Sequence, residues 1–78
     1  MPRFYFHLFD DFPVVDGEGI ELANLDAARA AAVSNIRDIL AEDVKHGRMP
    51  LGHRIEIADE GGAVVAAVAF REAVAIEA

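Results

Sequence analysis

A histidine followed closely by two aspartates is the arrangement in this 78-residue chain that comes nearest to a catalytic or metal site. His7 precedes Asp10 and Asp11, and a carboxylate that held one imidazole nitrogen would leave the other free for a metal ion or a proton. No further ligand follows at the spacing of a metal-binding motif. We therefore expect no metal here, with His7 packed in a strand and both aspartates bonding the backbone of a turn.

Four carboxylates within residues 10–18 form a second arrangement, of the oxygen-rich kind that binds Ca²⁺. They are Asp10, Asp11, Asp16 and Glu18. Apolar residues 12–15 interrupt them, so the spacing differs from that of a calcium-binding loop. The neighbouring Gly17-Glu18-Gly19 lacks the third glycine and the following helix of a phosphate-binding loop. We predict a solvated turn and no cofactor, while the sequence leaves cation binding by these carboxylates open.

Side chains for nucleophilic catalysis are almost absent. The chain has one serine, Ser34, within a predicted helix, and it has no threonine or cysteine. His7, His46 and His53 fall on separate predicted elements, with His46 at the C-terminal end of the helix and His53 at the start of a strand. We therefore expect that the protein is not an enzyme.

Aromatic residues on both faces of the first predicted strand are the most informative feature of the chain. Side chains alternate across a strand, which divides this one into two sets. One set is Phe4, Phe6 and Leu8, and the other is Tyr5, His7 and Phe9. A helix of this chain can cover the first set, but a chain this short has little left to cover the second. The second set is therefore expected to meet another molecule.

Two kinds of molecule could cover that second set. Single-stranded RNA binders stack bases on sheet aromatics, but phosphate binding rests on basic side chains. The chain has 14 acidic against 7 basic residues and a net charge of −7, so nucleic acid is not the expected partner. We predict instead a homodimer through the helix-free face of the sheet. The predicted interface residues are Tyr5, His7, Phe9, Val65 and Ala67.

Helix signals begin at Asn24 and end at Gly47. Asn24 is a good N-cap, and the alanines that follow are the strongest helix formers. Apolar residues then recur at spacings of three and four, which predicts one apolar stripe. The stripe consists of Val33, Ile36, Leu40 and Val44. Gly47 is the expected left-handed C-cap.

Strand signals surround this helix. The predicted strands are residues 2–9, 20–22, 53–58 and 63–70, with a short piece at 14–15 and a hairpin loop at 59–62. Their order is β-β-α-β-β, an α+β fold with an antiparallel sheet and one long helix packed on one face. Because residues 3–9 and 63–70 are apolar on both faces, we expect them at the centre and 20–22 and 53–58 at the edges. Residues 71–78 are expected to fray or to extend the last strand.

Length and composition limit the remaining possibilities. Residues 1–78 are predicted to form a single small domain, and without cysteine no disulfide supports it. Hydrophobic residues make up 54% of the chain, which is high for a small monomer and favours oligomerisation. We find no targeting segment and no membrane-spanning run, so we expect a cytoplasmic protein with no membrane partner.

The chain resembles a family of short domains of unknown function that is common in rhizobia and other alphaproteobacteria. The resemblance rests on MPRFYFHL at residues 1–8, DGEGIEL at 16–22, Leu25 with AAR at 27–29, and FREAV at 70–74. It implies a bacterial protein but no activity or catalytic residue. A looser likeness at fold level is to small antitoxin subunits of the HicB type, which pair an acidic sheet module with a basic toxin.

Three functional hypotheses are compatible with these features. The first is a non-enzymatic interaction module that homodimerises. The second is an antitoxin-like or regulatory accessory protein that docks a basic partner, which the net charge of −7 favours. The third is a weak single-stranded nucleic-acid binder that uses the rings of Tyr5, His7 and Phe9.

Overall fold

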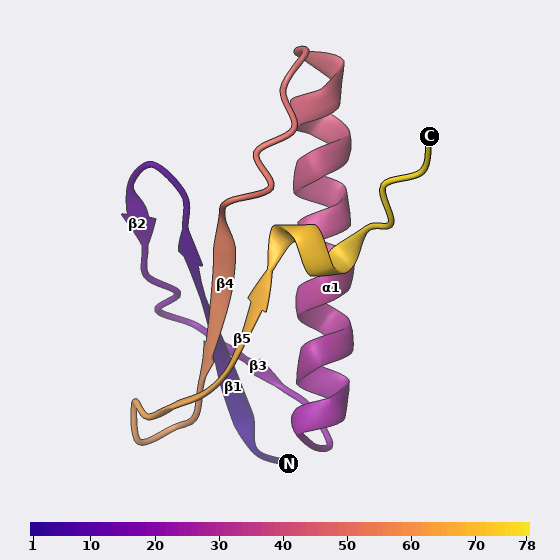
Figure 1. Cartoon of the computed structure of the whole chain (residues 1–78). Coiled ribbons are helices and arrows are strands. Elements are labelled where there is room, and N and C mark those ends of the chain that lie inside the picture. The colour runs from indigo at the N-terminus through magenta and orange to yellow at the C-terminus, as the bar shows by residue number, and fades with distance from the viewer.

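A five-stranded antiparallel sheet carries one long helix against one face in the computed structural model, which describes all 78 residues (Figure 1). The elements are β1 (Arg3–Phe9), β2 (Pro13–Val14), β3 (Ile20–Glu21), α1 (Leu25–Lys45), β4 (Arg54–Ala58), β5 (Val64–Ala69) and the 3₁₀ helix η1 (Phe70–Ala73). The predicted α+β fold is confirmed. The short piece predicted at 14–15 is β2, which makes the order β-β-β-α-β-β. Neither helix is long and apolar enough to span a membrane.

Local sequence determines both ends of α1. The side chain of Asn24 accepts a hydrogen bond from the amide of Ala27 at 2.8 Å, as an N-cap does. Beyond the other end, Gly47 has a φ of +80°, and its amide donates to the carbonyl of Val44 at 2.9 Å. Both predicted caps are confirmed.

The apolar stripe of α1 differs from the predicted one at its last turn. The buried residues are Ala28, Ala32, Ile36 and Leu40. Ile36 and Leu40 belong to the predicted stripe, and Val33 packs partly buried beside the core. Val44, however, is 50% exposed, because α1 runs on past the ends of the strands that would cover it (Figure 1). The prediction for Val44 is therefore wrong.

The order of the strands in the sheet is β2-β1-β4-β5, and β3 also pairs with β1. The prediction is right for β1, which is central, but wrong for β4 and β5. The tight hairpin at residues 59–62 makes β4 and β5 neighbours, and β1 occupies the other side of β4. Strand β5 therefore lies at an edge although it is apolar on both faces, and Val64 and Val65 are 55% and 39% exposed.

Two short strands share the outer edge of β1. β2 pairs opposite Leu8 and Phe9, whereas β3 pairs opposite Arg3 and Phe4. Neither strand pairs with the middle of β1, and residues 15–19 connect the two across this gap. The outer edge of β1 is thus made of two separate pieces.

The chain leaves the sheet after β5 and packs on the helix. In η1, Phe70 and Ala73 are buried in the same cluster as the α1 stripe. The side chain of Arg37 in α1 donates from Nε to the carbonyl of Ala73 at 2.8 Å. Residues 71–73, which were expected to fray or to extend the last strand, do neither, because they belong to η1.

Candidate functional site

The face of the sheet that α1 leaves uncovered, here called the helix-free face, is formed by alternate residues of its three longest strands. The rows are Tyr5, His7 and Phe9 from β1, Arg54 and Glu56 from β4, and Ala67 and Ala69 from β5. Cross-strand pairing places His7 beside Glu56 and Glu56 beside Ala67. One ring row is therefore followed by one charged row and one row of small side chains.

The predicted interface residues are only partly brought together. Tyr5, His7 and Phe9 form one continuous half-buried row, as alternation along β1 requires. Ala67 lies on the same face but is separated from that row by β4, and Val65 is the extra residue where the pairing of β4 and β5 shifts register. Alternation along residues 53–57 predicts Arg54 and Glu56 on the outward face, but the predicted strand order places this strand at an edge and not between β1 and β5.

Arg54 and Glu56 form an ion pair that covers part of the ring row. The Nε of Arg54 donates to Oε2 of Glu56 at 3.0 Å. The guanidinium carbon of Arg54 also lies 4.4 Å from the centre of the Phe9 ring. Such a cation–π contact contributes about 0.5–1 kcal/mol at an exposed site. Phe9 is therefore sheltered by its neighbour, whereas Tyr5 and His7 are not covered by a cation.

Four charged groups on this face form two ion pairs. Arg3 lies on the same side of β1 as Tyr5, and its guanidinium binds Glu21 at 3.3 Å. Together with the pair of Arg54 and Glu56, this gives two positive and two negative groups. The centre of the helix-free face, around Arg54 and Glu56, is thus neutral, whereas Asp59 and Glu60 add two carboxylates at its hairpin end.

A shallow hollow of about 230 Å³ adjoins the ring row at the hairpin end of the face. Its lining residues are Tyr5, His7, Ala58, Asp59, Glu60 and Gly62. The carboxylate of Asp59 is already engaged, because its Oδ1 accepts hydrogen bonds from the amides of Gly61 and Ala63. Glu60 likewise accepts from the amide of Arg3 at 3.1 Å. The hollow is consequently a recess in the face whose two carboxylates both accept hydrogen bonds from the backbone.

His7 is held by the turn after β2 and not by Asp10 or Asp11. Its Nδ1 accepts a hydrogen bond from the amide of Asp16 at 3.1 Å. An acceptor nitrogen carries no proton, so the neutral ring is protonated at Nε2. The imidazole thereby positions the turn, which differs from the acid–base role considered for His7 with the two aspartates.

The carboxylate of Asp16 closes the gap between β2 and β3. Its Oδ2 accepts from the amide of Phe6 at 3.1 Å, and its Oδ1 accepts from the amides of Glu18 and Gly19 at 3.0 and 3.1 Å. The sequence predicts only a turn here. The hydrogen bond between Asp16 and Phe6 joins residues ten positions apart, so no local sequence pattern predicts it. The only related sequence signal is the Asp-Gly-Glu-Gly turn at residues 16–19.

These hydrogen bonds also decide the ionisation of Asp16. Partial burial by itself would raise the pKa of this carboxyl group. The amides of Glu18, Phe6 and Gly19 and the nearby His7 ring favour the anion more strongly, so the pKa of Asp16 lies below its ordinary value. Asp16 is therefore anionic throughout the neutral range.

The remaining carboxylates of the acidic segment serve the backbone or lie near basic groups. Asp10 accepts from the amide of Phe12 at 2.8 Å, as predicted for a turn aspartate. Asp11 lies 4.0 Å from a guanidinium nitrogen of Arg48 and 3.8 Å from Nε2 of His53. No group of three or more His, Asp or Glu side chains stands close enough together to hold a metal ion.

Comparison with known proteins gives one match. A family model described as a domain of unknown function, DUF6894, matches residues 3–71. No curated protein and no solved structure matches the chain. The matched range runs from the first residue of β1 into η1, so it includes every strand and the helix.

Proposed function

The chain belongs to the DUF6894 family, a domain of unknown function, and on that premise we propose that it is a non-enzymatic interaction module that homodimerises through the helix-free face. The observation that carries the proposal is the row of Tyr5, His7 and Phe9, half-buried on a face that no element of the chain covers. Aromatic side chains are enriched at the centres of protein interfaces.

Charge favours a second copy as the molecule on this face. Two chains of net charge −7 repel each other over most of their surfaces. The helix-free face is neutral at its centre, where Arg54 and Glu56 stand two residues apart on β4. Consider two copies stacked face to face, with a two-fold axis that lies between their sheets, perpendicular to β4 and level with Ile55. This axis would place Arg54 of one copy opposite Glu56 of the other. The face is therefore complementary to itself.

The area that a stable dimer needs sets the extent of the interface. A standard interface takes about 800 Å² from each partner, roughly a sixth of the 5073 Å² surface of this chain. The ring row is too small for that alone, so the contact must extend across β4 to Ala67 and Val65. Burying about 400 Å² of apolar surface per dimer contributes on the order of 10 kcal/mol before association costs of about 4–15 kcal/mol. We therefore expect a dimer of moderate affinity.

Sedimentation velocity over about 1 µM to about 1 mM tests the proposal. We expect the wild-type chain to dimerise within this range. Phe9→Asp places a charge in the ring row and should give a monomer. Phe12→Asp is the matched control, because Phe12 is 79% exposed in the β1–β2 turn, outside the helix-free face. That variant should dimerise like the wild type.

A second variant keeps this test clear if Phe9→Asp fails to fold. Ala67 is exposed, so Ala67→Arg adds a bulky cation to the face without opening the core. The proposal is contradicted if the wild type stays monomeric at about 1 mM, or if folded Phe9→Asp and Ala67→Arg chains dimerise as well as the wild type.

A further inference from the structure

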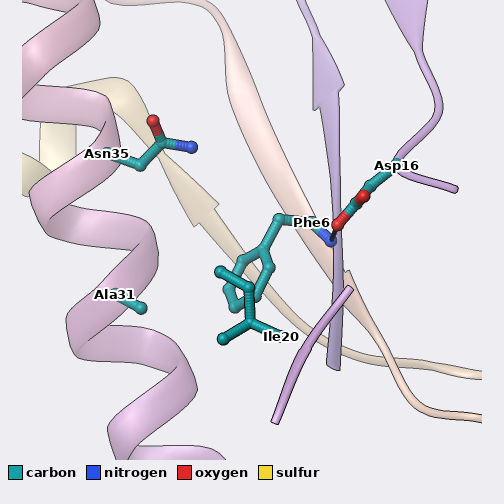
Figure 2. Close-up of a pocket in the computed structure, with 5 residues that line it drawn as sticks. All are labelled: Phe6, Asp16, Ile20, Ala31 and Asn35. Carbon is teal, nitrogen blue, oxygen red and sulfur yellow. Dashed lines mark hydrogen bonds between the residues drawn. The ribbon is translucent and has the colours of Figure 1, made fainter. Parts of the chain in front are cut away.

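A second surface feature, here called the edge groove, lies on the helix side of the sheet between α1 and the outer edge of β1 (Figure 2). It has a volume of about 330 Å³, at the lower end of the range of ligand pockets. Its lining residues are Phe6, Asp16, Ile20, Ala31 and Asn35. The groove exists because β2 and β3 leave the middle of β1 without a strand, so that Phe6 is only half-buried.

Apolar side chains form the walls of the edge groove. The ring of Phe6 and the side chain of Ile20 face the methyl group of Ala31 across it (Figure 2). Ile20 is 51% exposed, so this wall is open to a ligand. Such walls suit an aliphatic chain, whose methylene groups lose contact with water there.

Polar groups stand on opposite sides of the groove. The carboxylate of Asp16 lies on the strand side, and the amide of Asn35 points in from the helix (Figure 2). An ionised carboxylate offers about four acceptor sites, and the amides of Phe6, Glu18 and Gly19 take three of those on Asp16. One acceptor site, on Oδ2, is therefore left for a ligand.

The charge around the groove selects a cation. Of the five carboxylates in residues 10–21, Glu21 pairs with Arg3 and Asp11 lies near Arg48, whereas Asp16, which lines the groove, has no ion-pair partner. On the helix wall, Asp38 follows Ala31 and Asn35 at the spacing of one helix face and is exposed. Both sides of the groove thus repel an anion and attract a cation with an aliphatic body.

We propose that the edge groove binds a lysine side chain of a basic partner protein, with its methylene groups against Phe6, Ile20 and Ala31 and its ammonium at Asp16 and Asn35. A lysine keeps its aliphatic stem on apolar surface and its charge at the rim. A single ammonium fits the one free acceptor of Asp16, whereas an arginine fork needs two parallel acceptors. The lysine must come from the partner, because the only lysine of this chain, Lys45, lies at the end of α1, where its Nζ is 3.6 Å from Oε2 of Glu42.

Peptide titration followed by ¹H–¹⁵N correlation spectra tests this assignment. The probe is a five-residue peptide with blocked termini and a central lysine between alanines, so that the ammonium is its only charge. It is compared with the same peptide carrying norleucine, arginine or glutamate. We expect saturable shifts of the amides of Phe6, Asp16, Ile20 and Ala31 and of the Asn35 side chain. Binding should be at least about fivefold weaker with norleucine or arginine and absent with glutamate. Salt should weaken it.

Variants of the groove residues test whether the lysine peptide binds in the edge groove. Asp16→Asn removes the anion but also disturbs the turn, so Ala31→Leu serves as the second variant, because it fills the groove from the helix wall. Ala30→Leu is its control, since Ala30 is exposed on the same helix and does not line the groove. Ala31→Leu should abolish the shifts and Ala30→Leu should preserve them.

Three results would overturn the assignment. The first is no shift at the groove residues, and the second is equal binding of the lysine and norleucine peptides. The third is binding of butylammonium as tight as that of the lysine peptide, which would indicate a small-amine site. The groove lies on the opposite side of the sheet from the helix-free face, so each result is independent of dimerisation.

Discussion

At the scale of single residues, Asp16 accepts hydrogen bonds from three backbone amides. It occupies the place that a continuous edge strand would take along β1, and it satisfies the amide of Phe6 that such a strand would otherwise bond. One side chain thereby lets the outer edge of β1 be built from two short pieces. The same carboxylate lines the edge groove, so support of the turn and cation binding meet at one residue.

Replacing Asp16 by Asn should destabilise the fold in a pH-dependent way. We expect a loss of about 1–2 kcal/mol at pH 7, because amide hydrogen bonds to a partly exposed anion are exchanged for weaker ones. The pKa of Asp16 is lowered on folding, so its stabilisation is complete above the unfolded value of about 3.9 and is lost as the pH falls through the folded value. Urea unfolding at several pH values should therefore show the difference between variant and wild type shrinking below about pH 4.

The control for that measurement is Asp10→Asn. Asp10 accepts a single hydrogen bond, from the amide of Phe12 in an exposed turn. Its replacement should change stability by less than about 0.5 kcal/mol. An equal loss in both variants, or a difference at Asp16 that does not vary with pH, would contradict the role given to the Asp16 carboxylate.

Gly19 is the other residue on which this turn depends. It has a φ of +68°, and a Cβ there would lie 2.8 Å from the carbonyl oxygen of Phe4. Gly19→Ala should therefore cost about 2–4 kcal/mol, from the backbone conformation and the overlap together. Gly47→Ala, with a φ of +80° but open space around it, should cost only about 1–2 kcal/mol. Thermal unfolding measures the stability that each variant loses. Equal losses in the two variants would show that the overlap of the Gly19→Ala methyl group with the Phe4 carbonyl costs no stability.

At the scale of elements, the α1–η1 contact holds the end of β5 in place. β5 passes directly into η1, whose Phe70 and Ala73 are buried against the helix. The amide of Ala69 is bound by the side chain of Glu72 at 3.0 Å, which removes one free donor from the edge of β5. A strand edge with free donors can pair with other chains, so η1 limits how far β5 can do this.

Arg37→Met should loosen η1 while leaving the sheet intact. The variant keeps most of the aliphatic stem but loses the hydrogen bond from Nε to the carbonyl of Ala73. We expect a loss of about 1 kcal/mol and faster hydrogen exchange at Phe70 than at residues of β4. Arg29→Met, at another exposed position of α1, is the control. Unchanged exchange at Phe70 in Arg37→Met would show that burial alone holds η1.

The elements show where sequence patterns suffice to predict this fold. The caps of α1, the turn at Asp10 and the alternation of β1 and β4 rest on neighbours within a few residues, and all were predictable. The position of β5 was not, because two-sided apolar character usually indicates a central strand, whereas the short hairpin determines its place here. Because of the same error in strand order, the sequence did not predict that Arg54 and Glu56 lie between the ring row and β5 in the candidate site.

At the scale of the whole molecule, the helix-free face and the edge groove differ in charge. Five of the 14 carboxylates lie in residues 10–21, and one of them, Asp16, lines the edge groove. The helix-free face, on the other side of the sheet, has a neutral centre with its rings half-buried. A like-charged second copy fits the neutral face, and a basic partner fits the acidic edge.

Sedimentation equilibrium of charge-exchange variants tests the central claim, dimerisation through the helix-free face, most directly. Arg54→Glu and Glu56→Arg each place like charges opposite one another across the proposed two-fold axis, so each single variant should be monomeric at concentrations where the wild type is a dimer. The double variant exchanges the two charges and should restore the dimer to within about tenfold of the wild-type affinity. If the wild type, both single variants and the double variant sediment alike, the helix-free face is not the dimer interface.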